Sequence, residues 1–181
     1  MQTPTVPEVQ NADLIQLARH HINAENDRDL DRTMDTISPN GAEYRIYATE
    51  ESLNSREDIR RFYDETYTAF PDMKVEIKNL VPSQATRQVF LEYRFVATFR
   101  KPIWGLAPTN RLFSYNGAIV YEFDANGKLT KEINYFDKTE LLASMGVIRN
   151  TNTLPGKVLL IFPQSPFYFL KSILLNILRR R

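Results

Sequence analysis

The chain has 181 residues, and its 23 Lys and Arg residues nearly balance its 22 Asp and Glu residues, so its charge gives no reason to expect a nucleic-acid partner. Cysteine is absent, which excludes disulfides, a thiol nucleophile and a thiolate metal site. The two histidines, His20 and His21, are adjacent, which leaves few members for a histidine zinc site or a serine-type triad. The length predicts one domain with an appendage, and no glycine loop suited to nucleotide phosphates is visible.

The N-terminal third of the chain predicts an arm followed by two helices. Residues 1–10 are polar and contain prolines, which is typical of a flexible arm rather than a secretory signal, and we therefore expect a cytoplasmic protein. A helix begins at Asn11, because five residues then recur on one face: Leu14, Leu17, Ala18, His21 and Ile22. A shorter helix is expected over residues 30–37, and residues 44–48 are expected to form a short strand.

A third helix is predicted between Ser55 and Pro71. The Ser55 hydroxyl can accept a hydrogen bond from a backbone N–H group, and Asp58 three residues later completes a capping-box pattern. Apolar and aromatic residues then recur at helical spacing until the proline ends the helix: Ile59, Phe62, Tyr63, Thr66, Tyr67 and Phe70.

Beyond Pro71 the hydrophobic period changes from helical spacing to two, which predicts strands. Alternation is clear over residues 87–100, and further strands are predicted over residues 111–123 and 129–137, joined by a turn in which Gly127 suits a positive φ. A short helix over residues 139–145 follows. Helices followed by a run of antiparallel strands predict an α+β domain over residues 11–148, with the helices on one face of a curved sheet.

Residues 149–181 form a linker (149–157) and an apolar C-terminal extension. The run from residue 158 to 178 has about the length of a membrane span, but prolines and polar residues interrupt it: Pro163, Pro166, Lys171 and Asn176. From Pro166 the pattern favours an amphipathic helix with one apolar side: Phe167, Leu170, Ile173, Leu174, Ile177 and Leu178. Three destinations stay open for residues 166–181: the protein's own domain, where it could close the mouth of a cavity, a partner chain, or peripheral contact with an anionic membrane.

Several short segments follow one another in a characteristic order and spacing over roughly residues 11–148: Asn26–Leu30, Ser55–Ile59, Ala69–Asp72, Thr109–Arg111, Asn126–Leu129, Tyr135–Asp137, Leu141–Leu142 and Met145–Gly146. Together these segments resemble the SnoaL-like polyketide cyclases of the nuclear transport factor 2-like superfamily.

The resemblance implies a cystatin-like fold, in which a curved antiparallel sheet forms a cone around the N-terminal helices. It further implies a small hydrophobic ligand inside the cone, frequent homodimers formed through the sheet, and no metal or cofactor. Characterised relatives close a ring in a polyketide by an intramolecular aldol reaction, in which an acidic side chain serves as general acid and base and a histidine lies on a neighbouring strand.

Four residues are candidates for the acid/base chemistry. Asp137, at the end of the last predicted strand, is the first, although an Asp at this position would also cap the helix that follows. Asn134 stands where the resemblance places the acidic residue, and Glu132 projects to the same side of the strand and could substitute for it, or be an ordinary exposed strand residue. His21 could reach the cone from the first helix or be a core histidine, since the strand at residues 117–122 has no histidine.

Six further residues are candidates for ligand binding. The hydroxyl groups of Tyr44, Tyr63, Tyr93 and Tyr121 could donate hydrogen bonds to a ligand carbonyl, or serve only as packing residues. Trp104 would cover the mouth of the cone or plug it, and Arg111 would bind a carboxylate or form a surface ion pair.

Three hypotheses of function follow. The first is a cofactor-free cyclase or isomerase that acts on a small hydrophobic carbonyl compound. The second is a non-catalytic binding protein that keeps the cone without the acid/base pair, and the third is an interaction module whose C-terminal helix docks on a membrane or a partner.

Overall fold

The computed structural model describes residues 11–148. The predicted N-terminal arm and the predicted linker and amphipathic segment at 149–181 lie outside these residues. The secondary structure is, in chain order, α1 (Asn11–Asp27), α2 (Leu30–Thr36), β1 (Glu43–Ile46), β2 (Glu51–Leu53), α3 (Arg56–Ala69), β3 (Lys74–Ser83), β4 (Gln88–Thr98), β5 (Leu112–Phe123), β6 (Leu129–Phe136) and α4 (Lys138–Ser144). Within the described part of the chain, no helix is long and apolar enough to cross a membrane.

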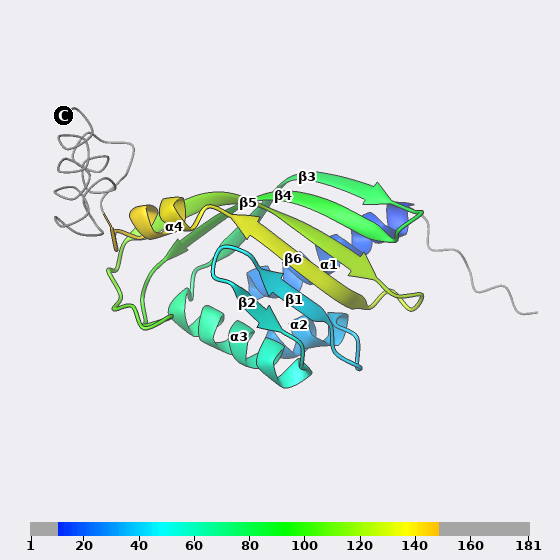
Figure 1. Ribbon diagram of the computed structural model, residues 1–181, viewed down its shortest axis with the longest axis horizontal. Coiled ribbons are helices and arrows are strands. Elements are labelled where there is room, and N and C mark those ends of the chain that lie inside the picture. Colours follow the sequence, from blue (N-terminus) through cyan, green and yellow to red (C-terminus); the bar gives the residue numbers. More distant parts are fainter. Residues whose placement is uncertain (1–10, 149–181) are drawn as a thin grey trace, which may run out of the picture.

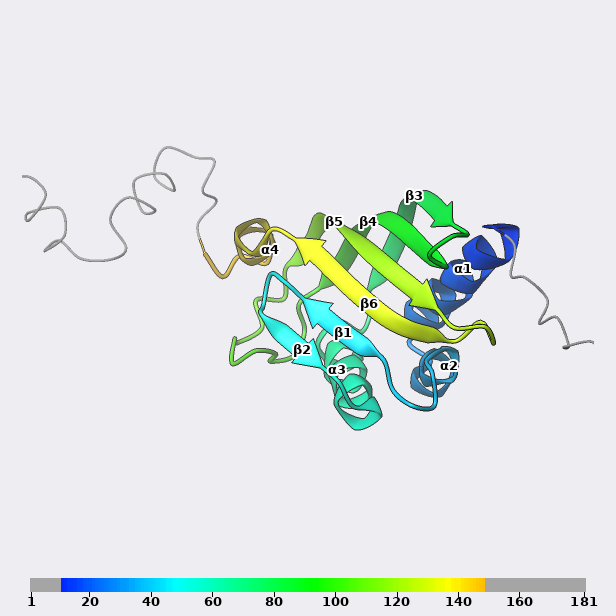
Figure 2. The same cartoon turned by 45° about the vertical axis from the view of Figure 1, so that its right-hand side comes forward.

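The strands form one sheet in the order β2-β1-β6-β5-β4-β3. The predicted antiparallel pairing is confirmed from β3 to β6, but β1 pairs with β6 in parallel, and the three-residue β2 was not predicted. Figures 1 and 2 show α1, α2 and α3 on the same side of the curved sheet, with α4 at the end where β6 finishes. The predicted α+β class is therefore confirmed.

The alternation along β4 and β5 divides the sheet into an inner and an outer face. Residues of the predicted inner face of β4 are all buried: Val89, Leu91, Tyr93, Phe95 and Ala97. Their cross-strand neighbours on β5 include Tyr121, Ile119, Tyr115 and Phe113, which are also buried. The helices cover this inner face, since α1 packs on β3 and β4.

Local chemistry fixes the predicted helix ends and the hairpin turn. Ser55 caps α3 as predicted, because its Oγ accepts a hydrogen bond of 3.0 Å from the Asp58 backbone N–H. Gly127 has a φ of +73° in the β5–β6 turn, and Gly146 has a φ of +78° just beyond the end of α4, so both positions suit glycine.

Asn26, the last residue but one of α1, attaches this helix to β3. Its side-chain oxygen accepts the Val75 N–H at 2.7 Å, and its amide N–H donates to the Val75 carbonyl at 3.1 Å. The Asn26 side chain thus forms the two backbone hydrogen bonds that a neighbouring strand would form with Val75. These bonds fix the position of the end of α1 along β3.

We predict that Asn26→Ala lowers the free energy of unfolding by about 1–3 kcal/mol, because two part-buried backbone groups of Val75 lose their partner. Urea denaturation measures the loss. The control is Asp27→Ala, which removes only an exposed ion pair with Arg32 and should cost at most about 1 kcal/mol. Equal losses in the two variants would contradict this role of Asn26.

Candidate active site

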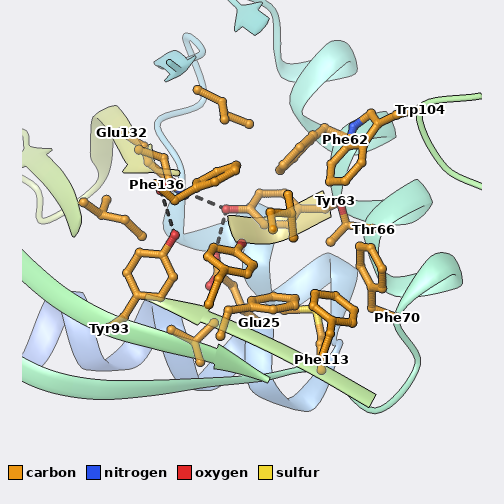
Figure 3. Close-up of a pocket in the computed structure, with 18 residues that line it drawn as sticks. Glu25, Phe62, Tyr63, Thr66, Phe70, Tyr93, Trp104, Phe113, Glu132 and Phe136 are labelled. Atoms are coloured by element: carbon orange, nitrogen blue, oxygen red, sulfur yellow. Dashed lines mark hydrogen bonds between the residues drawn. The ribbon is translucent and has the colours of Figure 1, made fainter. Parts of the chain in front are cut away.

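A cavity of about 80 Å³ lies between α1, α3 and the inner face of the sheet. Half of the residues in its wall are aromatic, and they include Phe62, Phe70, Phe95, Phe113, Tyr115 and Phe136. Trp104 also lines it and is 38% exposed, so the loop between β4 and β5 lies where the cavity meets solvent. Figure 3 shows Trp104 beside Phe62, across the cavity from Tyr93.

Two buried carboxylates interrupt this apolar wall. Glu25 of α1 and Glu132 of β6 both line the cavity, and each is only 6% exposed. The Tyr63 hydroxyl, from α3, donates a hydrogen bond of 2.7 Å to Glu25 Oε1 and lies 3.5 Å from Glu132 Oε2 (Figure 3). The hydroxyl groups of Tyr44 and Tyr63 are hydrogen-bonded at 3.1 Å.

His21 lies directly behind the two carboxylates and is completely buried. Its Nε2 is 3.2 Å from Glu25 Oε1 and 3.6 Å from Glu132 Oε2. Its Nδ1 is 2.6 Å from the Thr36 hydroxyl, which donates its own proton to the Thr33 carbonyl at 2.6 Å. Because Thr36 Oγ1 can then only accept, His21 carries a proton on Nδ1, and its Nε2 faces carboxylate oxygens as a second donor.

This arrangement favours the doubly protonated, positively charged imidazole. Burial alone would lower the pKa of His21, but the charges and hydrogen bonds of Glu25 and Glu132 outweigh it and raise the pKa to about 9. The positive ring partly neutralises two carboxylates that would otherwise repel each other in an apolar environment. We name His21, Glu25, Glu132 and Tyr63 the acid/base cluster.

Glu132 is a member of the acid/base cluster whose pKa is raised above the usual value of a glutamate. Burial raises the pKa of the Glu132 carboxyl, the hydrogen bond with His21 opposes this, and the charge of Glu25 adds to the increase. A carboxyl group with a raised pKa can release and take up a proton closer to neutral pH. Burial also raises the pKa of Tyr63 well above its usual range, so its hydroxyl remains a neutral donor.

A second polar group lies on the sheet side of the cavity. The Tyr93 hydroxyl donates a hydrogen bond of 2.8 Å to Asn134 Oδ1, and both residues line the cavity. Because this bond occupies the amide oxygen, the amide N–H groups of Asn134 are the donors available to a ligand oxygen.

Gly117 makes room for the Tyr93 hydroxyl. A Cβ atom at position 117 would lie 2.5 Å from Tyr93 Oη and 2.8 Å from the backbone oxygen of Tyr135. Any other residue at this position would therefore displace the tyrosine or the strand beside it.

We predict that Gly117→Ala displaces the Tyr93 ring, breaks its bond to Asn134 and lowers the free energy of unfolding by about 1–3 kcal/mol. Denaturant unfolding measures the stability, and a crystal structure of the variant shows the ring. Ala118→Ser, on the outer face of β5, is the control and should change stability by less than about 0.5 kcal/mol. An unmoved Tyr93 ring in Gly117→Ala would refute the steric argument.

The predicted site residues divide into two groups. The structure brings Tyr63, Tyr93, Glu132, Asn134 and Trp104 together around one cavity. The sequence left open whether Glu132 was an exposed strand residue, and the structure buries it in the cavity wall.

The other candidates lie elsewhere. Asp137 caps α4, because its Oδ1 accepts from the backbone N–H groups of Thr139 at 2.7 Å and Glu140 at 3.0 Å, and it is exposed outside the cavity wall. Arg111 is exposed next to Gly146.

Three predicted residues support the cavity from behind. Tyr121 packs edge-on against the His21 ring, with the ring centroids 5.4 Å apart. Tyr44 reaches the cluster through Tyr63, and His21 itself lies behind the carboxylates rather than in the cavity wall.

Sequence reasoning missed Glu25 and Thr66. Glu25 stands four residues after His21 on α1, so the two share one helix face, and this spacing was the available signal. Thr66 of α3 lines the cavity, and its buried hydroxyl has no hydrogen-bond partner, which leaves it for a polar atom of a ligand. The sequence carries no corresponding signal, because a threonine at helical spacing is indistinguishable from a packing residue.

The acid/base cluster also has the residue types of a metal site. One ligand atom each from His21, Glu25 and Glu132 lies within 4.8 Å of the others. A metal ion would have to replace the Nε2 proton, whereas in the structure the three groups and Tyr63 satisfy one another by hydrogen bonds and charge.

We predict that the stability of the protein falls as the pH rises through the pKa of His21. That pKa is about 9 in the folded protein and 6.5 when unperturbed, so the stabilisation is fully present below pH 6.5 and disappears as the pH passes about 9. The raised pKa of Glu132 acts in the same direction. Urea unfolding at several pH values should show a loss on the order of 3 kcal/mol across this window.

The matched variants for this experiment are His20→Gln and His21→Gln. The first replaces an exposed neighbour and should keep the pH dependence, while the second should flatten it. A wild-type protein whose stability does not change between pH 6.5 and 9.5 would rule out the ion pairs.

The family is established by sequence. The model of the SnoaL-like polyketide cyclase family matches residues 15–145, so the chain belongs to this family and the resemblance is confirmed. A search of curated proteins gave no significant match.

Solved structures share the fold. AclR of Streptomyces galilaeus, described as a candidate hydroxylase, is 20% identical, with a TM-score of 0.69 over 82% of this chain and 90% of its own. IdmH of Streptomyces antibioticus, a candidate polyketide cyclase, is 20% identical, with a TM-score of 0.62 over 74% and 98%.

A third similar structure is SalBIII, an epoxide hydrolase/cyclase-like enzyme with a role in pyran ring formation in the polyether salinomycin. It is 15% identical, with a TM-score of 0.62 over 71% of this chain and 94% of its own. At sequence identities this low, the structural similarity shows a shared fold but not a shared reaction.

Proposed function

We propose that the protein is an acid/base enzyme of the cyclase type, which acts on a small hydrophobic carbonyl compound. The observation that carries the proposal is Glu132, a carboxyl group buried in the wall of an apolar cavity beside a second carboxylate. Burying two carboxylates is costly, and a protein that only binds an apolar ligand gains nothing from them. The membership of the SnoaL-like polyketide cyclase family supports a reaction of this class.

Glu132 is the proposed base and acid. As a carboxylate it takes a proton from a carbon next to a carbonyl group. The C–H electron pair becomes the C=C bond of an enolate, and the π electron pair of the carbonyl group moves to its oxygen. The N–H groups of Asn134, whose amide oxygen accepts from the Tyr93 hydroxyl, would donate to that oxygen and stabilise the developing charge.

Ring closure then needs no additional reactant. The enolate carbon forms a bond with the carbon of a second carbonyl group in the same molecule, and the electron pair of that C=O bond moves to its oxygen. Glu132 returns its proton to this oxygen. The product has the same atoms as the substrate, with one new C–C bond and one hydroxyl group in place of a carbonyl.

The remaining residues keep Glu132 ready for both steps. His21 and Tyr63 hold Glu25 by a charged contact of 3.2 Å and a hydrogen bond of 2.7 Å. Burial raises the pKa of Glu132 and the charge of Glu25 adds to the increase, so that Glu132 is a stronger base than a carboxylate in water. The aromatic wall excludes water that would compete for the enolate.

We predict that Glu132→Gln lowers the rate of proton abstraction by about 100- to 10,000-fold, because glutamine keeps the shape of the side chain but has no basic oxygen. Deuterium uptake at the acidic carbon of 2-tetralone, a hydrophobic ketone, is followed by NMR in D2O. Quenching of Trp104, the only tryptophan, reports binding separately.

Asp137→Asn is the control, because asparagine also caps helices and Asp137 lies outside the cavity wall. It should keep wild-type exchange. Binding without exchange in the wild-type protein, or equal exchange in Glu132→Gln, would reject the catalytic role of Glu132.

A further inference from the structure

The wall of the cavity contains one threonine, Thr66 of α3, whose buried hydroxyl group has no hydrogen-bond partner. Elsewhere in the helices, the hydroxyl groups of Thr33 and Thr36 donate to backbone carbonyl groups of their own helix, at 2.8 and 2.6 Å. Thr66 does not form such a bond. A buried hydroxyl group without a partner lowers stability, and its position in a cavity wall points to a ligand atom that completes it.

Thr66 lies at the end of the cavity opposite the acid/base cluster. It stands one helical turn after Tyr63, whose hydroxyl group points away from Thr66 and donates to Glu25 (Figure 3). It also stands one turn before Phe70, whose ring lies against Trp104 with the ring centroids 6.2 Å apart. The length of the Tyr63 side chain therefore separates two polar ends of one cavity, and Thr66 is at the end near Trp104.

The surroundings of Thr66 are apolar. Phe62 and Phe70 lie one turn before and one turn after it on the same face of α3, and Trp104 is the third aromatic neighbour (Figure 3). Among the described residues that line the cavity, the charged side chains are the two carboxylates of the acid/base cluster, at the other end. A charged ligand group beside Thr66 would therefore be buried without a counter-charge, and the carboxylates would also repel an anion.

These surroundings favour an uncharged oxygen atom of a ligand. The hydroxyl group of threonine can both donate and accept a hydrogen bond, so it suits a carbonyl oxygen as well as a hydroxyl group. The three aromatic side chains around it would contact the apolar part of the same ligand.

We propose that Thr66 determines the specificity of the site by forming a hydrogen bond with a second, uncharged oxygen atom of the substrate. The substrate is then a neutral hydrophobic ketone with one oxygen at the acid/base cluster and another at the opposite end of the molecule. The role of the first oxygen rests on the proposed function, whereas the bond to Thr66 concerns binding and is measured without any reaction.

Two ketones that differ by one hydroxyl group test the proposal. 2-Tetralone has its oxygen at one end, and 6-hydroxy-2-tetralone has a second oxygen at the other end. Isothermal titration calorimetry of the full-length protein gives the Kd of each ketone, and it does not depend on the fluorescence of Trp104, which lies close to the substituted position. The measured quantity is the ratio of the two Kd values within each variant.

We expect the wild-type protein to bind 6-hydroxy-2-tetralone roughly five- to tenfold more tightly than 2-tetralone, the effect of one hydrogen bond between uncharged groups. Thr66→Val replaces the hydroxyl group by a methyl group and should remove this preference, while Thr66→Ser should retain it. Thr68→Val is the matched control, because Thr68 is exposed on the same helix and does not line the cavity. It should keep the wild-type ratio.

The stability of the free protein separates ligand binding from a structural role of Thr66. If its hydroxyl group has no partner, Thr66→Val should have a urea midpoint at least as high as that of the wild-type protein, as should Thr68→Val. A midpoint that falls in Thr66→Val alone would mean that the hydroxyl group already has a structural partner, and would overturn the proposal.

Three binding results would also overturn it. They are the absence of a preference in the wild-type protein, an equal preference in Thr66→Val, and tighter binding of the 6-carboxylate analogue of 2-tetralone than of the hydroxyl compound. Failure of both ketones to bind would reject this proposal together with the proposed function. Binding with the expected preference but without deuterium exchange would reject only the catalytic role of Glu132.

Discussion

The central constraint of this molecule is the burial of Glu25 and Glu132 next to each other in an apolar cavity. Two buried carboxylates without a counter-charge would strongly destabilise the fold. The His21 ring, 3.2 and 3.6 Å from their oxygens, supplies that charge, and the Thr36 hydroxyl keeps the ring in the orientation that directs Nε2 at them. Because these groups come from α1, β6 and the end of α2, the cluster also requires these elements to pack together.

Local patterns predicted most of the fold, and non-local contacts account for what they missed. The alternation along β4 and β5 predicted the buried face, and the Ser55 pattern predicted the start of α3. The parallel pairing of β1 with β6 joins residues almost ninety positions apart, so no short-range pattern indicates it. For Asp137, the sequence predicted a helix cap as the alternative to a catalytic role, because a cap involves only the next three residues.

The candidate site was harder to predict, because its residues are defined by which side chains are buried in the cavity wall. From the sequence, a glutamate at position 132 could be exposed or could face a cavity. Glu132 is buried in the cavity wall because α1 and α3 pack on this face of the sheet. His21 and Glu25 share a helix face, but the sequence alone does not show which carboxylate on the sheet they meet. Neighbouring residues of β6 point to opposite faces of the sheet, so Glu132 faces the cavity and Ile133 lies on the outer face.

The protonation state of His21 tests the account most directly. The ring nitrogens of ¹⁵N-labelled His20→Gln protein can be observed by NMR at pH 7.5, where His21 is then the only histidine. A pKa of about 9 for His21 predicts protons on both Nδ1 and Nε2 at this pH. A neutral ring with one unprotonated nitrogen would contradict it, because Glu25 and Glu132 would then lack the positive charge that their burial requires.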